Sequence, residues 1–445
     1  MNRFRTIFLT ILFCSQLVAV FGQKIEIPFE GEYLKDVKQW VDDDGFTIID
    51  LRFTSNNHYF YMISPHGKIV SEYKNFYLNL YYKGFTSNKD EFTLYFSRTP
   101  KGKIEFLDFF KSSERPPVTT LWENEPKDYF QSVTAKGNLL FMDFDKKKSN
   151  IEFTYLDGPV SEKKSFTFEV PKEMTKEIVK SGYMGMGIDN IYSSHFGSAL
   201  VFFENQQIIV LKTSKEELIN YTYDLADQKF TMYTYPYPDQ SEYFGTTNGS
   251  FLVDDKVFLL TMNMNRLCLD VLDLELNPIV SKCYGKDQQL ELKTAPAVYR
   301  NGKNAEETWV GGDKSTSRIL RELSQHSFGY ISVMKKQDGG YSLKLGSESA
   351  SSMTPGVMIG SGAGVSSSGN YQPPTSLCFT GSLTRDFEPY NDDKNYFETI
   401  FQKTEFQFVG EFGVQNGVIA TKDFFYHFQY NRKDSKLEIE RFTFD

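Results

Sequence analysis

The sequence predicts an all-β fold, a β-propeller of about seven blades, with a range of six to eight. Two observations lead to this prediction: β-hairpin patterns recur along the chain, and both ends of the mature chain have strand-like sequences. Runs of β-branched and aromatic residues are broken by Gly, Asn, Asp or Pro, which is typical of short strands joined by turns. A four-stranded blade repeated with loops of variable length produces such a sequence.

Seven hairpins can be placed from their turn residues. They share a hydrophobic pattern rather than a sequence motif, since the chain has no WD dipeptide, kelch set or Asp-box. The last gap between hairpins is wide enough for an unmarked eighth blade. The hairpins are predicted over residues 59–73, 92–106, 139–155, 199–211, 257–272, 328–345 and 424–442.

The two ends of the chain are expected to close the ring. Apolar residues alternate over 25–29, and the chain ends with apolar residues at 437, 439, 442 and 444. Pairing a terminal strand into the blade made by the other end would remove two open sheet edges at once.

An outer-membrane β-barrel is the alternative fold, because the chain is rich in aromatic residues and carries an export signal. Barrel strands need an apolar residue at every second position over about 9–11 residues. The hairpin that contains Lys103, Glu105 and Asp108 has charges at both parities, which disfavours a barrel.

Few helices are expected. Residues 175–180 could form one or two turns, and 314–326 has the best amphipathic pattern. A Gly/Ser-rich loop is predicted over 346–374, and its residues Gly360, Gly362 and Gly364 are candidates for a partner-binding segment. No lysine follows these glycines at the position that a phosphate-binding loop requires.

The N-terminus has the features of a secretory signal peptide. Arg3 and Arg5 precede an apolar run over 6–21, which is too short and too early for an ordinary membrane span. Gly22 suits the −1 position of signal peptidase, so Gln23 is the expected mature N-terminus.

The predicted organisation is therefore a signal peptide over 1–22 and one propeller domain over 23–445. No further run approaches the roughly 18 apolar residues of a spanning helix, so no transmembrane helix is expected in the mature chain. The expected location is the periplasm, the outer-membrane surface or the cell surface.

Composition and motifs exclude several function classes. The net charge of −9 argues against a nucleic-acid partner, which would need clustered Lys and Arg. The histidines show no metal-ligand spacing, and there is no GxSxG elbow, so no metal, cofactor or catalytic residue is predicted. Glycoside hydrolysis needs two positioned carboxylates. Any chain with 58 acidic residues offers such pairs, so their presence does not identify an enzyme.

Cys268 and Cys283 flank a turn that contains Asn277 and Pro278. Pairing a hairpin about this turn brings the two cysteines opposite each other, which predicts a cross-strand disulfide in an oxidising compartment. A slip of one residue in register would instead leave two free buried thiols. Cys378 has no predicted partner.

A tyrosine-rich segment is the second candidate for partner binding. Tyr233, Tyr235, Tyr237 and Tyr243 alternate with prolines in what is predicted to be a loop. Exposed tyrosines can stack on sugars or contact a protein partner at low entropic cost. The alternative is that every second tyrosine packs beneath the loop.

The chain resembles exported propeller-like proteins that are common in Bacteroidetes. The resemblance lies in its Lys/Asn/Phe/Tyr-rich composition, in a signal peptide that ends in Phe21-Gly22-Gln23, and in its degenerate hairpins. It implies a Gram-negative cell envelope and assigns no functional residues.

These observations predict a non-catalytic binding or scaffold protein that displays loops from a rigid ring to an envelope protein partner. The alternative is a carbohydrate-binding protein or glycoside-active enzyme with its site in the central funnel. Acidic residues and tyrosines converging at the ring axis would favour that alternative.

Overall fold

The computed structural model describes most of the chain. The described residues are 24–28, 34–77, 79–112, 115–123, 129, 131–145, 148–157, 163–172, 183–185, 199–214, 216–237, 247–295, 297–301, 304–309, 315–325, 328–348, 376–391, 395–404, 416–420, 423–431 and 436–444.

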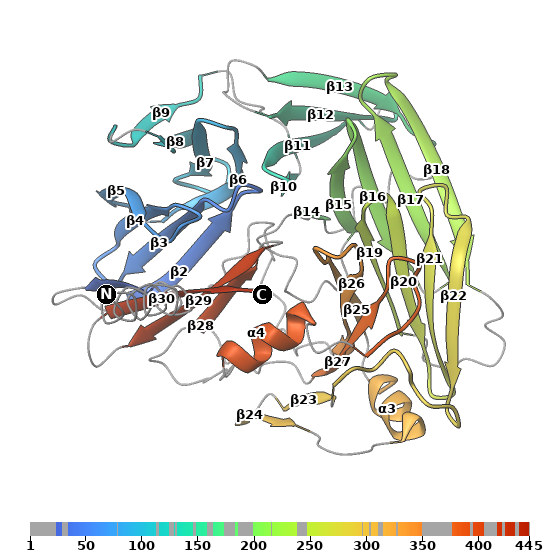
Figure 1. Cartoon of the computed structure of the whole chain (residues 1–445). Coiled ribbons are helices and arrows are strands. Elements are labelled where there is room, and N and C mark those ends of the chain that lie inside the picture. The colour runs from blue at the N-terminus through green and yellow to red at the C-terminus, as the bar shows by residue number, and fades with distance from the viewer. Residues whose placement is uncertain are drawn as a thin grey trace, which may run out of the picture.

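The described strands form seven separate sheets rather than one continuous sheet, and the sheets lie round a common centre (Figure 1). The predicted propeller is confirmed, and each of the seven predicted hairpins lies in a different sheet. Blades 1 to 3 follow the chain from the inside outwards. They comprise β2 (Leu34–Val41), β3 (Thr47–Phe53), β4 (Asn57–Ile63) and β5 (Ile69–Phe76); β6 (Tyr81–Ser87), β7 (Glu91–Ser97), β8 (Ile104–Phe110) and β9 (Val118–Leu121); and β10 (Gln131–Ala135), β11 (Asn138–Asp145), β12 (Asn150–Leu156) and β13 (Lys164–Glu169).

Blades 4 and 5 also follow the chain. Blade 4 has an additional short inner strand, β14, which pairs parallel with β15, whereas the other pairs in these two blades are antiparallel. The two blades comprise β14 (Tyr183–Gly185), β15 (Ala199–Glu204), β16 (Gln207–Thr213), β17 (Glu217–Asp224) and β18 (Lys229–Pro236); and β19 (Thr247–Val253), β20 (Lys256–Met262), β21 (Arg266–Leu272) and β22 (Pro278–Gly285).

Blade 6 departs from this simple order. Its outer strands β23 (Val298–Asn301) and β24 (Asn304–Trp309) precede its inner strands in the sequence. β23 pairs with β27, so the order is β24-β23-β27-β26-β25. The remaining strands are β25 (Phe328–Lys335), β26 (Tyr341–Glu348) and β27 (Ser376–Leu383).

Blade 7 closes the ring as predicted from the sequence. It comprises β28 (Asn416–Ala420), β29 (Phe424–Asn431), β30 (Lys436–Thr443) and, as its outermost strand, β1 (Lys24–Pro28). β1 pairs antiparallel with β30, with Ile25 opposite Ile439 and Ile27 opposite Leu437. This pairing joins the two ends of the chain by main-chain hydrogen bonds, so neither terminal strand is left isolated.

A buried histidine should make this closing blade sensitive to pH. Burial lowers the pKa of His427, on β29, from its usual 6.5, although Glu440 on the opposite strand acts in the other direction. Between this lowered pKa and 6.5, the unfolded chain binds more protons than the folded chain. The free energy of unfolding should therefore decrease as the pH falls through this range. We expect His427→Gln to flatten this decrease in urea unfolding curves. A variant that kept the full slope would contradict the assignment.

The two described helices accompany blade 6. α3 (Thr316–Leu323) lies within the predicted helical segment 314–326 and precedes β25. α4 (Tyr396–Thr404) was not predicted, and it occupies part of the wide gap before the last hairpin. No eighth sheet occurs among the described residues. The other predicted helix, 175–180, lies outside them.

The first three residues of the predicted glycine-rich loop form part of a strand instead. Residues 346–348 belong to β26, because they pair with residues 376–378 of β27. The remainder of the predicted loop, residues 349–374, lies outside the described residues. None of the described helices is long and apolar enough to cross a membrane.

Apolar side chains fill the spaces between neighbouring blades. The largest cluster joins blades 4, 5 and 6, and others join blades 3 and 4, blades 1 and 7, and blades 1 and 2. The inner strands of blades 5 and 6 approach to main-chain contact at Gly249 and Gly329. A Cβ atom added to Gly249 would lie 2.7 Å from the Cα of Tyr330, so glycine is needed for this approach.

Candidate functional site

The tyrosine-rich segment lies on the outer strand of blade 4. Tyr233 and Tyr235 belong to β18, which pairs with β17 along its whole length, so the predicted loop is wrong for these two residues. The strand continues to Pro236, which is tolerated because it lies at the end of an edge strand. Both tyrosines are half-buried and pack against the apolar cluster of blades 4 to 6.

The remaining residues of the two predicted partner-binding segments are less accessible or are not described. Tyr237 is buried, burial raises the pKa of its hydroxyl, and its ring belongs to the core. It therefore packs beneath the surface, which was the alternative considered for these tyrosines. Tyr243, Gly360, Gly362 and Gly364 lie outside the described residues.

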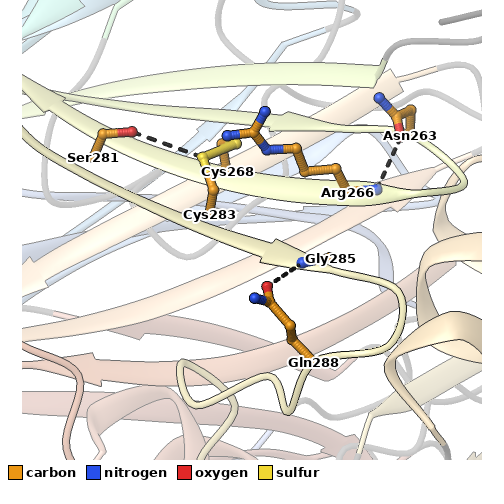
Figure 2. Close-up of a disulfide and its surroundings, with 7 residues drawn as sticks. All are labelled: Asn263, Arg266, Cys268, Ser281, Cys283, Gly285 and Gln288. Atoms are coloured by element: carbon orange, nitrogen blue, oxygen red, sulfur yellow. Dashed lines mark hydrogen bonds between the residues drawn. A yellow bond between two sulfur atoms is a disulfide. The ribbon is translucent and has the colours of Figure 1, made fainter. Parts of the chain in front are cut away.

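The two cysteines lie on the neighbouring blade 5. β21 and β22 pair with Cys268 directly opposite Cys283, their Cα atoms 4.1 Å apart, and a disulfide joins them (Figure 2). Cys378 is free and buried in β27. A disulfide of this kind fits an oxidising compartment.

The disulfide faces blade 4. Asp270 is opposite Ser281 two residues along the ladder from the cysteine pair, so all four side chains share one face of the sheet. Asp270 acts electrostatically on Tyr235 of β18, so this face points towards blade 4. The structure thus places two sets of sequence-predicted residues, Tyr233 with Tyr235 and Cys268 with Cys283, on the two sides of one junction between blades.

A buried carboxyl group lies in this junction. Burial raises the pKa of Asp270, while a hydrogen bond from Ser281 and the charge of Arg266 act against that rise. Burial, together with Asp270, also raises the pKa of the Tyr235 hydroxyl. The Ser281 hydroxyl lies 3.7 Å from the sulfur of Cys283 (Figure 2).

Exposed apolar side chains flank the junction. Ile279 on β22 is 43% exposed, and it is the extra residue of a β-bulge opposite Val271 and Leu272. Bulges re-aim side chains at sheet edges. We call Tyr233, Tyr235, Ile279 and the Cys268–Cys283 disulfide the blade 4–5 rim.

Loss of the disulfide should destabilise the fold. The chain-entropy model gives about 3 kcal/mol for a loop of about 15 residues, which is the separation of the two cysteines. We expect the double variant Cys268→Ser/Cys283→Ser to lose about that much free energy of unfolding. Denaturant titration with and without a reductant measures it. The stability of the double variant should not change when the reductant is added. Equal stability of the wild type and the double variant without reductant would contradict the prediction.

A second polar region lies where the innermost antiparallel strand of each blade, which is β15 in blade 4, turns into the next strand. We call these connections the inner turns. In blades 3, 4 and 5 they are two-residue turns with positive φ at both positions: Lys136-Gly137, Asn205-Gln206 and Asp254-Asp255. This geometry is that of the tight turns that suit twisted hairpins.

Side chains of successive inner turns contact one another from blade to blade. Lys136 of blade 3 pairs with Glu204 of blade 4, and Asn205 donates a 3.4 Å hydrogen bond to Asp255 of blade 5. Asp254 then pairs with Lys335 of blade 6 at 2.5 Å. These contacts tie neighbouring blades at one end of the ring.

The same series begins at a buried ion pair between blades 1 and 2. Lys111 Nζ lies 2.6 Å from Asp42 Oδ2, and both side chains are 3% exposed. Ser87 donates a 2.6 Å hydrogen bond to the same carboxylate oxygen, and Phe46 N–H donates to the other at 2.8 Å. Lys111 also donates to the carbonyl of Asn88 at 2.6 Å. The charges are thus satisfied within the protein.

Asp43, in the inner turn of blade 1, has a carboxyl group with a raised pKa. Desolvation by the surrounding protein raises the pKa of Asp43, and the positive charge of Lys136 in blade 3 lowers it. Glu204 of blade 4 also acts on it, so groups from three blades converge near Asp43. A carboxyl group with a raised pKa beside a second carboxylate is an arrangement that acid–base chemistry uses.

A buried triad that sequence analysis missed joins blades 1 and 2. Asp50 Oδ1 lies 2.9 Å from Nδ1 of His58, and the Tyr82 hydroxyl donates to Asp50 Oδ2. His58 Nε2 has no hydrogen-bond partner among the described residues. The three residues come from β3, β4 and β6, and their spacing in the sequence gives no signal. No group of three potential metal ligands occurs in the described part of the chain.

Comparison with known proteins gives structural likeness only. No family profile and no curated protein matches the sequence. The chain is similar to a solved DUF4221 family member from Bacteroides vulgatus, with 11% identity, a TM-score of 0.36 and coverage of 95% of this chain and 97% of that one.

Two other solved structures are also similar. One is the Dos1 propeller, with 9% identity, a TM-score of 0.32 and coverage of 78% of this chain and 68% of that chain. The other is cobalt-substituted ACO from Synechocystis, with 8% identity, a TM-score of 0.30 and coverage of 57% and 63%, so the chain spans less than two thirds of that protein. The assignment of a propeller rests on the sheet topology described above.

Proposed function

We propose that this chain is a non-catalytic, exported binding or scaffold protein, a protein–protein interaction module of the cell envelope. The observation that supports this proposal is the blade 4–5 rim. Tyr233, Tyr235 and Ile279 present partly exposed aromatic and apolar surface beside a disulfide. Tyrosine and apolar side chains held on rigid strands contact a partner with little loss of conformational entropy.

Export is supported by the predicted signal peptide and by the disulfide, which persists in oxidising compartments. Fractionation of cells that express a C-terminally tagged protein tests it. The mature protein should begin at Gln23 and be found in the envelope or periplasmic fraction. An uncleaved protein in the cytoplasmic fraction would refute export.

Partner binding can be tested by purifying the tagged protein natively from envelopes and identifying co-purified proteins by mass spectrometry. We expect a stoichiometric envelope protein with the wild type and at least a tenfold loss with Tyr233→Ala/Tyr235→Ala. Met232→Ala is the matched control, because Met232 is an exposed apolar residue of the same strand but points to the opposite face. A wild-type protein that elutes alone, or a partner that the double variant retains, would refute a role for the rim.

The carbohydrate alternative has its own supporting observation, the convergence of Asp43, Glu204 and Lys136 at the inner turns. A glycan array and a hydrolysis assay with Asp43→Asn as the paired variant would test it. Glycan binding or hydrolysis that Asp43→Asn abolishes would favour this alternative over the rim.

A further inference from the structure

The Cys268–Cys283 disulfide lies at an open edge of the ring. It joins β21 to β22, and β22 is the outermost strand of blade 5. On β21, Cys268 is 7% exposed and Asp270 is 3% exposed. On β22, Cys283 is partly exposed and Ser281 is exposed. Access to this face of the sheet therefore increases towards the outer strand, and an external reagent reaches the disulfide at Cys283.

The disulfide is also oriented for attack from that edge. In thiol–disulfide exchange a thiolate attacks one sulfur, in line with and opposite to the sulfur that leaves. Because Cys268 and Cys283 are directly opposite each other, the bond between their sulfurs runs across the ladder. The side of Cys283 Sγ that is remote from Cys268 thus faces away from β21, where the described strands of blade 5 end.

A cation lies on the same face as the disulfide. Arg266, Cys268 and Asp270 alternate along β21, so their side chains point to one face of the sheet. Arg266 is opposite Gly285, which has no side chain to fill that position. The Arg266 side chain extends along the strand towards Cys268 in Figure 2, and its charge reaches Asp270 beyond the cysteine. A neighbouring guanidinium stabilises a cysteine thiolate, which makes that sulfur a better leaving group.

A hydroxyl group connects the other sulfur to a buried carboxyl group. Ser281 Oγ lies 3.7 Å from Cys283 Sγ (Figure 2). Ser281 also donates a hydrogen bond to Asp270, whose pKa is raised by burial. Such a carboxyl group keeps its proton to a higher pH and can pass it through the hydroxyl to a sulfur. Each of the two sulfurs therefore has a group beside it that stabilises it once the disulfide opens.

We propose that the Cys268–Cys283 disulfide is a redox-active site, which accepts two electrons from an external dithiol by thiol–disulfide exchange. One thiolate of the dithiol attacks Cys283 Sγ, the bond between the protein sulfurs breaks, and Cys268 Sγ leaves with the electron pair beside Arg266. The second thiolate of the dithiol then displaces Cys283 Sγ, which takes a proton through Ser281. The dithiol is oxidised to a disulfide, and the two protons that it loses balance those that the cysteines gain. This chemistry does not depend on a partner bound at the blade 4–5 rim.

Reduction of the native protein tests the site. The mature protein is treated with dithiothreitol without denaturant, and the thiols are trapped by alkylation and located by peptide mass spectrometry. We expect the wild type and Lys111→Met to be reduced at the same rate, because the reagent reaches the disulfide in the folded state. Lys111→Met breaks the buried ion pair with Asp42 and should populate the unfolded state about a hundredfold more. A reduction rate that rises by such a factor would show that reduction needs unfolding, and it would overturn the proposal.

Arg266→Met tests the neighbouring cation. We expect it to raise the pKa of the thiols in the reduced protein by roughly one unit, measured from the pH dependence of alkylation. It should also slow reduction by about threefold, since a thiol of higher pKa leaves more slowly. The direction is informative, because a variant that only loosened the strand would be reduced faster.

Lys282→Met is the matched control for charge. Lys282 precedes Cys283 on β22, but its side chain lies on the opposite face of the sheet. This variant should keep the reduction rate and the thiol pKa of the wild type. If Arg266→Met also kept both, the proposal would be overturned.

A protein reductant identifies the source of the dithiol. Reduced thioredoxin represents a protein dithiol and dithiothreitol a small one. A thioredoxin variant that lacks its second cysteine should be trapped as a mixed disulfide on Cys283. Such trapping supports a protein dithiol, whereas reduction by dithiothreitol alone supports a small one. Trapping on Cys268 instead would contradict attack from the open edge and overturn the proposal.

Discussion

Replacement of Lys111 by methionine is expected to lower the free energy of unfolding by about 3–5 kcal/mol, the usual cost of leaving one member of a buried ion pair alone. The substitution keeps the apolar stem but removes the ammonium group from Asp42 and from the carbonyl of Asn88. Both side chains of the pair are 3% exposed, so water cannot replace the lost partner.

Denaturant titration of three variants separates this cause from a packing defect. Lys103→Met is the control on an exposed lysine of the same blade and should stay within about 0.5 kcal/mol of the wild type. Asp42→Asn added to Lys111→Met removes the uncompensated charge and should recover part of the loss. A double variant that is less stable than Lys111→Met would show that packing, rather than charge, is responsible.

The parts of the fold that the sequence predicts are those determined by neighbours in the chain. Each hairpin needs only two apolar runs and a turn, so all seven were placed correctly. The same local rule places Cys268 opposite Cys283, since the register of a hairpin follows from its turn. Ring closure was predictable because both chain ends have strand-like sequences, and each such strand needs a partner.

The parts that the sequence does not predict depend on contacts between distant segments. β23 pairs with β27 across the intervening β24, α3, β25 and β26, and nothing in its four residues indicates that partner. Asp42 and Lys111 come from different blades, and the Asp50–His58–Tyr82 triad spans two. β18 was taken for a loop because prolines follow its tyrosines, although Pro236 only ends the strand. The site residues are therefore less predictable than the fold that positions them.

One buried side chain, Asn395, ties the start of α4 to blade 6. Asn395 is fully buried and donates through Nδ2 to the carbonyl of Gly381 at 2.6 Å and to Ser382 Oγ at 3.0 Å. Its Oδ1 accepts from the N–H groups of Phe397 and Glu398 at 3.0 and 3.2 Å, which caps the helix. One amide thus joins the start of α4 to β27.

Asn395→Ala is therefore expected to cost about 2–4 kcal/mol, since it removes a cap and leaves buried polar groups unsatisfied. Asn395→Asp keeps the capping oxygen but not the Nδ2 donors, so it should preserve the helix start while weakening its attachment to β27. Asn265→Ala, at an exposed asparagine in a turn, is the control and should have little effect.

Hydrogen exchange distinguishes local from global effects. α4 packs Phe397 and Ile400 into an apolar cluster with Tyr330 of blade 6 and Phe425 of blade 7, so its release would expose the junction of the two blades. We expect faster exchange at residues 396–404 in Asn395→Ala and in the adjoining strands β27 and β29, with blades 2 to 4 unchanged. Uniformly faster exchange in all blades would show instead that the ring unfolds as one unit and that Asn395 contributes to its global stability.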